Sequence, residues 1–287
     1  MKNLITMLRP HHWVKNLLVF TILVAAKQAF NIELLWQNII VFFLFCLSAS
    51  SGYIINDVLD KKNDMRHPSK KFRPIASGKV SISIAFITTF ILLLLMACLS
   101  LVFFSPMVLY LLFGYFLLAV FYSLYLKKLP ILDLMMLSLF YFWRVWVGSE
   151  SANIPLSFWL IIFTLFLFFS LSCLKRYVEL QKSKTNREYK NIGGRGYLPN
   201  DDIFVMLIGI ASSFAALVVL SLYFHEINYY FSYIYIIILF LWLMRLWLLS
   251  YRNIMYDDPL VFAIKDKWSL ILFFFAGVFI IIDTLLI

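Results

Sequence analysis

The sequence is short of the residues that mark most other protein classes. Only 14% of its 287 residues are charged, and it contains nine glycines, eight prolines and three cysteines. The low glycine and proline content excludes collagen-like, linker-rich and low-complexity chains, and the scarcity of charge argues against a soluble domain. Because Cys46, Cys98 and Cys173 all lie in apolar segments, we expect neither a disulfide framework nor a cysteine metal site.

Apolar residues dominate instead, at 63% of the chain with a mean hydropathy of +0.89. Only helices and closed barrels satisfy backbone groups in lipid, so apolar runs of about 20 residues predict transmembrane helices. Nine spans are predicted: 14–30, 35–56, 81–104, 107–126, 131–149, 155–177, 202–223, 229–250 and 268–287. The expected fold class is an all-α integral membrane protein, with a single domain over residues 1–287.

Basic residues fall on one side of these predicted helices. If the N-terminus is cytoplasmic, every lysine and arginine except Lys27 and Arg144 lies in or near an inner segment. The positive-inside rule then predicts an N-in, C-out topology in the cytoplasmic (inner) membrane, with the long loops 57–80 and 178–201 facing the cytoplasm. The net charge of +10 is explained by this topology, so nucleic acid is not an expected partner.

A cluster of acids and amides follows the second span. It runs Asn56-Asp57-Val58-Leu59-Asp60-Lys61-Lys62-Asn63-Asp64. Asn56, Asp60 and Asp64 recur every four residues, which places them on one helix face at the membrane boundary. Mg²⁺ takes a few such oxygen ligands together with water and substrate phosphates. A solvated helix end whose acids offset nearby lysines is the alternative, but acids at the end of an apolar span favour a metal site.

Basic side chains flank this cluster. Arg66, Lys70 and Arg73 follow it in the 57–80 loop, and Arg9 and Lys15 precede or open the first span. Beside a bound Mg²⁺, arginine can grip phosphate through two hydrogen bonds and lysine can act as a point charge. The positive-inside pattern is the alternative explanation for each of them, as is snorkelling for Lys15.

The sixth span ends in a second polar motif that contains Lys175, Arg176 and Glu179. Glu179 lies one helical turn beyond Lys175, so a plain ion pair between them is the alternative to a role in a site. Arg144 lies inside a span, where a charge is expensive, and is therefore a candidate for lining a buried cavity. Pairing with Glu150 and snorkelling outward are its alternatives.

These motifs resemble the UbiA-type intramembrane prenyltransferase superfamily, in which an acidic motif follows the second of nine spans and a Lys-Arg-x-x-acid motif follows the sixth. Four blocks are similar to its polyprenyl-phosphate phosphoribosyltransferase branch: Leu8 to Asn16, His67 to Gly78, Lys175 to Leu180, and Asp257-Asp258-Pro259 with Lys265-Asp266-Lys267. One departure is that Glu179 and Ser183 stand where many members have a second Asp-x-x-x-Asp motif.

The resemblance implies a UbiA-like helical bundle that transfers 5-phosphoribosyl from phosphoribosyl pyrophosphate to polyprenyl phosphate with Mg²⁺, in the synthesis of cell-envelope glycan precursors. It implies the Mg²⁺ ligands Asn56, Asp60 and Asp64, catalytic roles for Asp57, Asp60, Asp64, Lys175 and Glu179, and substrate binding by Arg9, Lys15, Arg66, Lys70, Arg73, Arg144 and Arg176.

Two other functions compete with this one. A superfamily relative would move a prenyl group from prenyl diphosphate to an aromatic, haem or glyceryl-phosphate acceptor, which the missing second acidic motif disfavours. A transporter would place its polar residues at the membrane midplane, whereas here they cluster at one face. The length of the lipid and the formation of a homo-oligomer are left open by the sequence.

Overall fold

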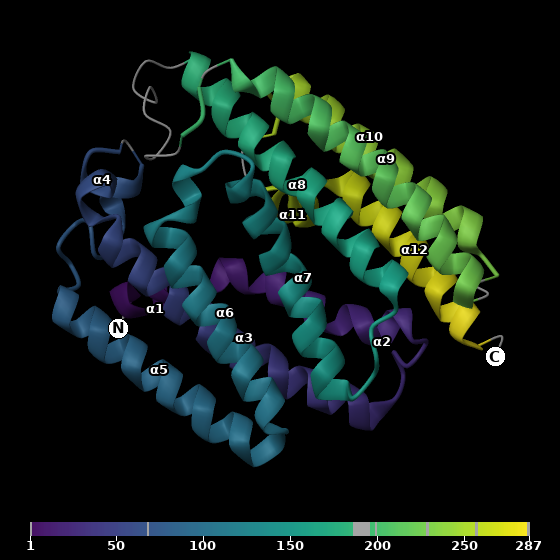
Figure 1. Cartoon of the computed structure of the whole chain (residues 1–287), viewed down its shortest axis with the longest axis horizontal. Helices are drawn as coiled ribbons and strands as arrows, with labels where there is room; N and C mark the ends of the chain where they lie inside the picture. The colour runs from purple at the N-terminus through teal and green to yellow at the C-terminus, as the bar shows by residue number, and fades with distance from the viewer. Residues whose placement is uncertain are drawn as a thin grey trace.

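The computed structural model describes residues 2–67, 69–185, 196–198, 200–227, 230–255 and 258–285 (Figure 1). Every regular element in these ranges is a helix, which confirms the predicted all-α class. Pro68 and Asp257 lie outside the described residues, as does the segment 186–195 of the second predicted loop.

Six of the described helices are long and apolar enough to cross a membrane. They are α3 (Ile32–Leu59), α5 (Ile82–Phe103), α6 (Pro106–Leu124), α8 (Phe158–Thr185), α9 (Asp201–Ile227) and α10 (Ser232–Tyr251), and each coincides with a predicted span. The local sequence sets where several begin. Asn31 and Ser81 cap α3 and α5 by accepting hydrogen bonds from backbone amides, and Pro106 occupies the first turn of α6. The chain is thus a multi-pass membrane protein.

Two further helices, α7 (Leu132–Ala152) and α12 (Lys267–Leu285), match the predicted spans 131–149 and 268–287. Helix α7 lies between the two halves of the bundle (Figure 1). One hydrophobic core packs it against α3, α5 and α6, and a second packs it against α8, α9 and α10. Polar side chains on α7 therefore lie at the centre of the molecule.

The first predicted span, 14–30, differs from the expected α-helix. A 3₁₀ helix, η1 (Pro10–Phe20), leads into the five-residue α2 (Thr21–Ala25). Arg9 adopts a left-handed backbone conformation with φ of 53°, which turns the chain after α1 (Lys2–Leu8) before Pro10 opens η1. Backbone without α-helical hydrogen bonding is tolerated at membrane depth where protein encloses it.

Helix η1 is enclosed in this way because it lies directly against α7 at Gly148. A Cβ atom on Gly148 would come within 2.0 Å of the carbonyl oxygen of Val19, so no other residue fits there without moving η1. The contact holds the buried side chains of Lys15 and Asn16 beside the face of α7 that carries Arg144.

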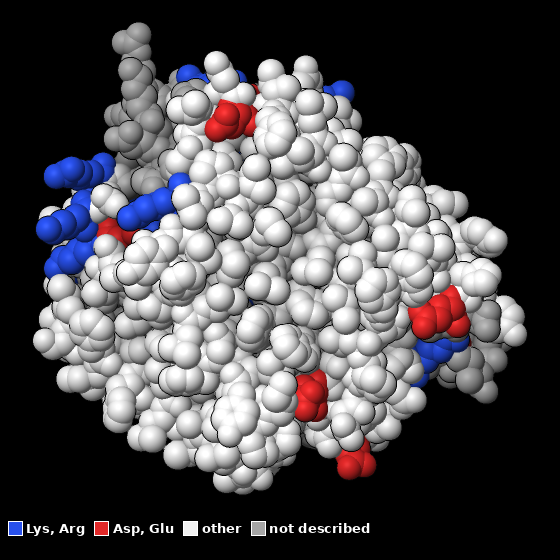
Figure 2. All heavy atoms as spheres, viewed as in Figure 1, with Lys and Arg blue, Asp and Glu red and all other residues white. Residues whose placement is uncertain are grey.

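Charged side chains are unevenly spread over the surface. Lysines and arginines gather at the end of the molecule around α4 (Lys61–Met65), whereas most of the visible face is uncharged (Figure 2). Large apolar side chains such as Phe90 and Val102 point outward, with 67% and 74% of their surface exposed. Such an outer surface is that of a helix bundle whose solvent is lipid.

Candidate active site

A polar cavity of about 310 Å³ lies between η1, α3, α6, α7 and α8. Nine of the residues predicted from the sequence line it: Arg9, Lys15, Asn56, Asp60, Lys70, Arg73, Arg144, Lys175 and Glu179. Lys127, in the short 3₁₀ helix η3 (Leu126–Lys128), lines it as well. Seven cations therefore face the cavity, against the two carboxylates of Asp60 and Glu179. Such a lining favours ligands that carry several negative charges.

Asn56 and Asp60 are the two predicted metal ligands that face the cavity. Helix α3 ends at Leu59, and the chain turns at Asp60 before α4 begins. The carboxylate of Asp60 lies 2.5 Å from Nζ of Lys127 and keeps 23% of its side chain exposed. Lys127 was not predicted as a site residue, because nothing in its local sequence separates it from a basic residue at a membrane boundary.

Asp64, the third predicted ligand, instead contacts an arginine. It is buried, and its carboxylate accepts a hydrogen bond from Nη1 of Arg73 at 2.6 Å. The same Nη1 lies 3.1 Å from the carboxylate of Asp57, which also accepts a hydrogen bond from Arg9. Asp57 and Asp64 thus lie behind the cavity lining and hold Arg9 and Arg73 toward it.

Asp258 belongs to one of the blocks recognised in the sequence, but it was not predicted as a site residue. It caps the N-terminus of α11 (Pro259–Lys265), where its carboxylate accepts a hydrogen bond from the backbone amide of Leu260. Its other oxygen lies 2.6 Å from Nζ of Lys15 and 3.2 Å from Nζ of Lys175. Burial alone would raise the pKa of Asp258, but these two lysines outweigh burial and hold it below its ordinary value.

Arg176 does not line the cavity, although Lys175 beside it does. Its guanidinium is fully buried, lies 2.5 Å from the carboxylate of Asp133 on α7, and also contacts Glu179. The ion pair of Glu179 on its own helix is therefore with Arg176, three residues away, rather than with Lys175 as the sequence suggested. Arg176 joins α8 to α7 behind the cavity wall.

Arg66 was predicted to bind substrate, but the structure places it outside the cavity lining. It is exposed at the C-terminal end of α4 and is absent from the cavity lining. His12, which was not predicted, does line the cavity. Its Nδ1 is buried and has no hydrogen-bond partner among the described residues.

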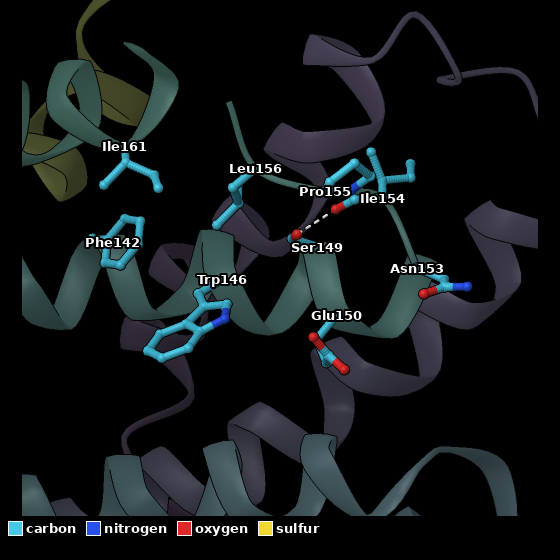
Figure 3. Close-up of a pocket in the computed structure, with 9 residues that line it drawn as sticks. All are labelled: Phe142, Trp146, Ser149, Glu150, Asn153, Ile154, Pro155, Leu156 and Ile161. Atoms are coloured by element: carbon cyan, nitrogen blue, oxygen red, sulfur yellow. Dashed lines mark hydrogen bonds between the residues drawn. The ribbon is translucent and has the colours of Figure 1, made fainter. Parts of the chain in front are cut away.

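Arg144 is buried at the level of the middle of α6 and α7, and faces the cavity. It donates hydrogen bonds to the side chain of Asn16 and the hydroxyl of Tyr115, both at 2.9 Å, and to the carbonyl oxygen of Phe140. The predicted alternatives, pairing with Glu150 and snorkelling, are both absent. Glu150 lines a separate pocket of about 560 Å³ near the C-terminal end of α7, beside Trp146 (Figure 3).

Comparison with known proteins identifies a family and several relatives. Residues 17–269 match the model of the UbiA prenyltransferase family. The chain is 33% identical over 278 residues to the uncharacterised protein y4nM of Sinorhizobium fredii, a match that covers 93% of this chain and 53% of that protein. It is 35% identical over 187 residues to the decaprenyl-phosphate phosphoribosyltransferase of Mycolicibacterium smegmatis, covering 62% of this chain and 57% of that enzyme. The chain thus spans little more than half the length of either relative.

A solved structure has the same fold. A UbiA homologue from Archaeoglobus fulgidus bound to GPP and Mg²⁺ superposes with a TM-score of 0.73 over 96% of this chain and 98% of that one, at 12% sequence identity. The all-α bundle, the cavity between its halves and the match over residues 17–269 agree. The chain belongs to the UbiA prenyltransferase family.

Proposed function

We propose that the protein transfers a 5-phosphoribosyl group from phosphoribosyl pyrophosphate to a polyprenyl phosphate of the decaprenyl type. The observation that carries the proposal is the charge of the cavity, where seven cations face two carboxylates. The two proposed substrates bring four phosphate groups between them, whereas prenyl transfer to an uncharged acceptor brings only the diphosphate of its donor. The similarity to the Mycolicibacterium enzyme supports the same donor and acceptor.

Mg²⁺ fits the donor groups that face this cavity. The amide oxygen of Asn56 and the carboxylate of Asp60 are hard oxygen ligands, and Mg²⁺ is usually held by one or two carboxylates together with substrate phosphates. Asp64 was predicted as a third ligand, and its contact with Arg73 suits it better to positioning that arginine. A bound Mg²⁺ would neutralise charge on the pyrophosphate leaving group.

The chemistry makes modest demands on the protein. A phosphate oxygen of the lipid forms a bond to C1 of the ribose while the bond from C1 to the pyrophosphate oxygen breaks, and the electron pair leaves with pyrophosphate. The acceptor phosphate is already ionised near neutral pH, so no strong general base is required. Positioning and electrostatic stabilisation of the developing charges supply the catalysis.

We assign the remaining side chains by their place around the cavity. Lys70 and Arg73 contact donor phosphates, with Arg66 nearby at the surface, and Arg9 and Lys15 contact the phosphate of the lipid. Lys175 and Glu179 close the cavity from α8, while Asp57 and Arg176 hold their neighbours in place. Arg144 is a further substrate-binding residue.

The membrane arrangement that goes with this function has nine spans and an N-in, C-out topology. The segment from η1 through α2 would form the first span, and α7 and α12 would complete the set. The cavity would then open to the cytoplasm at the inner membrane, where phosphoribosyl pyrophosphate is available. Residues 1–287 would act as one domain, alone or as a homo-oligomer.

Transfer of label tests the function directly. Membranes that contain the protein, Mg²⁺ and decaprenyl phosphate are incubated with phosphoribosyl pyrophosphate labelled in the ribose, and the organic extract is counted. We expect label in the extract, and none with the Asp60→Asn variant. If label enters the extract only from a labelled prenyl diphosphate given an aromatic acceptor, the alternative prenyltransferase function replaces this one.

A further inference from the structure

Arg144 differs from most other cations of the cavity in its surroundings. Arg9, Lys15, Arg73, Lys127 and Lys175 each lie within 4.0 Å of a carboxylate, on Asp57, Asp258, Asp64 or Asp60. Among the described residues, no carboxylate lies within that distance of Arg144, whose hydrogen-bond acceptors are an amide, a hydroxyl and a carbonyl oxygen. Its charge is therefore satisfied by neutral groups alone.

An uncompensated charge in this position needs an explanation. Arg144 is only 3% exposed and lies midway along a helix at the centre of the bundle. Buried charges are usually paired, because removing an ion from water is costly and neutral hydrogen bonds recover only part of that cost. The protein side of Arg144 is filled by rings, with the centroids of Phe45 and Tyr115 at 5.1 and 5.2 Å from Cζ. The remaining side is the cavity, so a missing counter-charge would lie there.

A second cation approaches the same place. Nζ of Lys15 lies 5.6 Å from the ring centroid of Tyr141, and Cζ of Arg144 lies 5.6 Å from the same centroid. The Tyr141 hydroxyl lies 3.4 Å from the carboxylate of Asp258, which also holds Lys15. Both cations also line the cavity, and Arg144 lies at the level of Phe45, eleven residues before Asn56 on α3, so this part of the cavity is away from Asn56 and Asp60.

We propose that Arg144 and Lys15 form a second anion site in the cavity, which binds a phosphomonoester and is separate from the diphosphate and Mg²⁺ site at Asn56 and Asp60. The proposal rests on the proposed function, because both substrates carry such a group: the 5-phosphate of the ribosyl donor and the phosphate of the lipid. A phosphomonoester dianion supplies the charge that Arg144 lacks, and its oxygens suit a planar guanidinium.

Binding without turnover tests the site. The protein in detergent micelles is titrated with three ligands: ribose 5-phosphate, farnesyl phosphate, and pyrophosphate with Mg²⁺. We expect Arg144→Gln to weaken the binding of one phosphomonoester by about 10-fold or more while binding of pyrophosphate with Mg²⁺ is unchanged. Arg245→Gln is the matched control, since it removes one arginine whose partner, Asp266, lies outside the cavity lining, and it should leave all three affinities unchanged.

The two monoesters distinguish the sources of the phosphate. Selective loss of farnesyl phosphate binding assigns the site to the lipid, in agreement with the role proposed above for Lys15, whereas selective loss of ribose 5-phosphate binding assigns both the site and Lys15 to the donor. If Arg144→Gln does not fold, Arg144→Lys replaces it, because lysine keeps the charge but loses the planar fork, and we expect a several-fold loss for the same ligand. A folded variant that binds both monoesters as the wild type does would overturn the site.

The outcome is independent of the labelled-product assay. Binding that depends on Arg144 in a protein that makes no ribosylated lipid would leave the anion site standing and remove the proposed function. Product formation by a protein whose phosphomonoester binding does not depend on Arg144 would support the proposed function and remove the anion site.

Discussion

Two buried arginines lie in neighbouring helices and have opposite surroundings. Arg176 on α8 contacts the carboxylates of Asp133 and Glu179, whereas Arg144 on α7 contacts neutral acceptors and faces the polar cavity. Their sequences give little hint of this difference, since both lie in or beside apolar segments. The comparison teaches that burial alone does not identify a functional charge. Arg176, which pairs with acids behind the cavity wall, stabilises the fold, whereas Arg144, which faces the cavity without an acid, is available to a ligand.

The largest effect should follow from breaking the pair of Arg176. Arg176→Gln leaves Asp133 buried without a counter-charge, and we expect a loss of about 3–5 kcal/mol in the free energy of unfolding. Arg144→Gln should cost less stability, because it leaves no buried acid behind. Thermal unfolding in detergent measures both. The double variant Arg176→Met with Asp133→Leu serves as the control and should recover most of the loss; equal destabilisation by the two single arginine variants would contradict the comparison.

The next largest effect concerns the two acids Asp60 and Asp64. Asp60→Asn removes a carboxylate that faces the cavity, and we expect activity to fall by about 100-fold or more with a higher Mg²⁺ requirement. Asp64→Asn loosens Arg73 instead, so we expect a loss of about 10- to 100-fold at an unchanged Mg²⁺ requirement. Rates measured across a Mg²⁺ titration separate the two. A similar shift of the Mg²⁺ dependence in both variants would mean that Asp64 is a metal ligand.

A smaller effect is expected for Asp258, which holds two cavity lysines. Asp258→Asn removes the shared counter-charge of Lys15 and Lys175, and we expect kcat/KM to fall by about 10-fold or more. Because the folded pKa of Asp258 is below its ordinary value, its contribution to stability is present above about pH 4 and is lost as the pH falls further. Asp266→Asn is the control, since that acid pairs with Arg245 outside the cavity lining. Unaltered kinetics of Asp258→Asn would mean that the lysines need no positioning.

The smallest effect concerns His12. It lines the cavity together with Arg9 and Lys15, whose charges disfavour a further positive charge on the imidazole, so we expect the imidazole to be neutral from pH 5 to 8. The ratio of wild-type to His12→Phe activity should therefore stay constant across that range, whatever its value. An acidic limb near pH 6 that is present in the wild type and missing from the variant would show that His12 gains a proton in the working enzyme.

The sequence predicted the positions of the helices well and the contacts between side chains less well. Apolar runs located α3, α5, α6, α8, α9 and α10, because twenty apolar residues in lipid have few alternatives to a helix. The same reasoning predicted an α-helix over 14–30, where the structure has η1 and the short α2 instead, and the close packing of η1 against Gly148 is encoded by no local pattern.

The site divides in the same way. Residues in the recognisable motifs, such as Lys15, Arg73 and Lys175, do reach the cavity. Their partners were not predicted, since Asp258 is 243 residues from Lys15 and Lys127 is 67 residues from Asp60. A repeat of four placed Asp64 on the face of Asp60, but only the three-dimensional position of Arg73 decides where that carboxylate points.

The pair of Lys15 and Asp258 also constrains how the protein is made. Lys15 leaves the ribosome 243 residues before its partner, which at about 5–20 residues per second corresponds to a delay of about 10–50 s. During all of that interval η1 lacks Asp258, and until residue 148 has been synthesised it also lacks the enclosing surface of α7. We therefore expect Lys15 to stay in water or at the membrane surface until Asp258 is in place. The segment that carries Lys15 is thus assembled long after it is synthesised, and completion of the active site reports that the 243 residues up to Asp258 have been made.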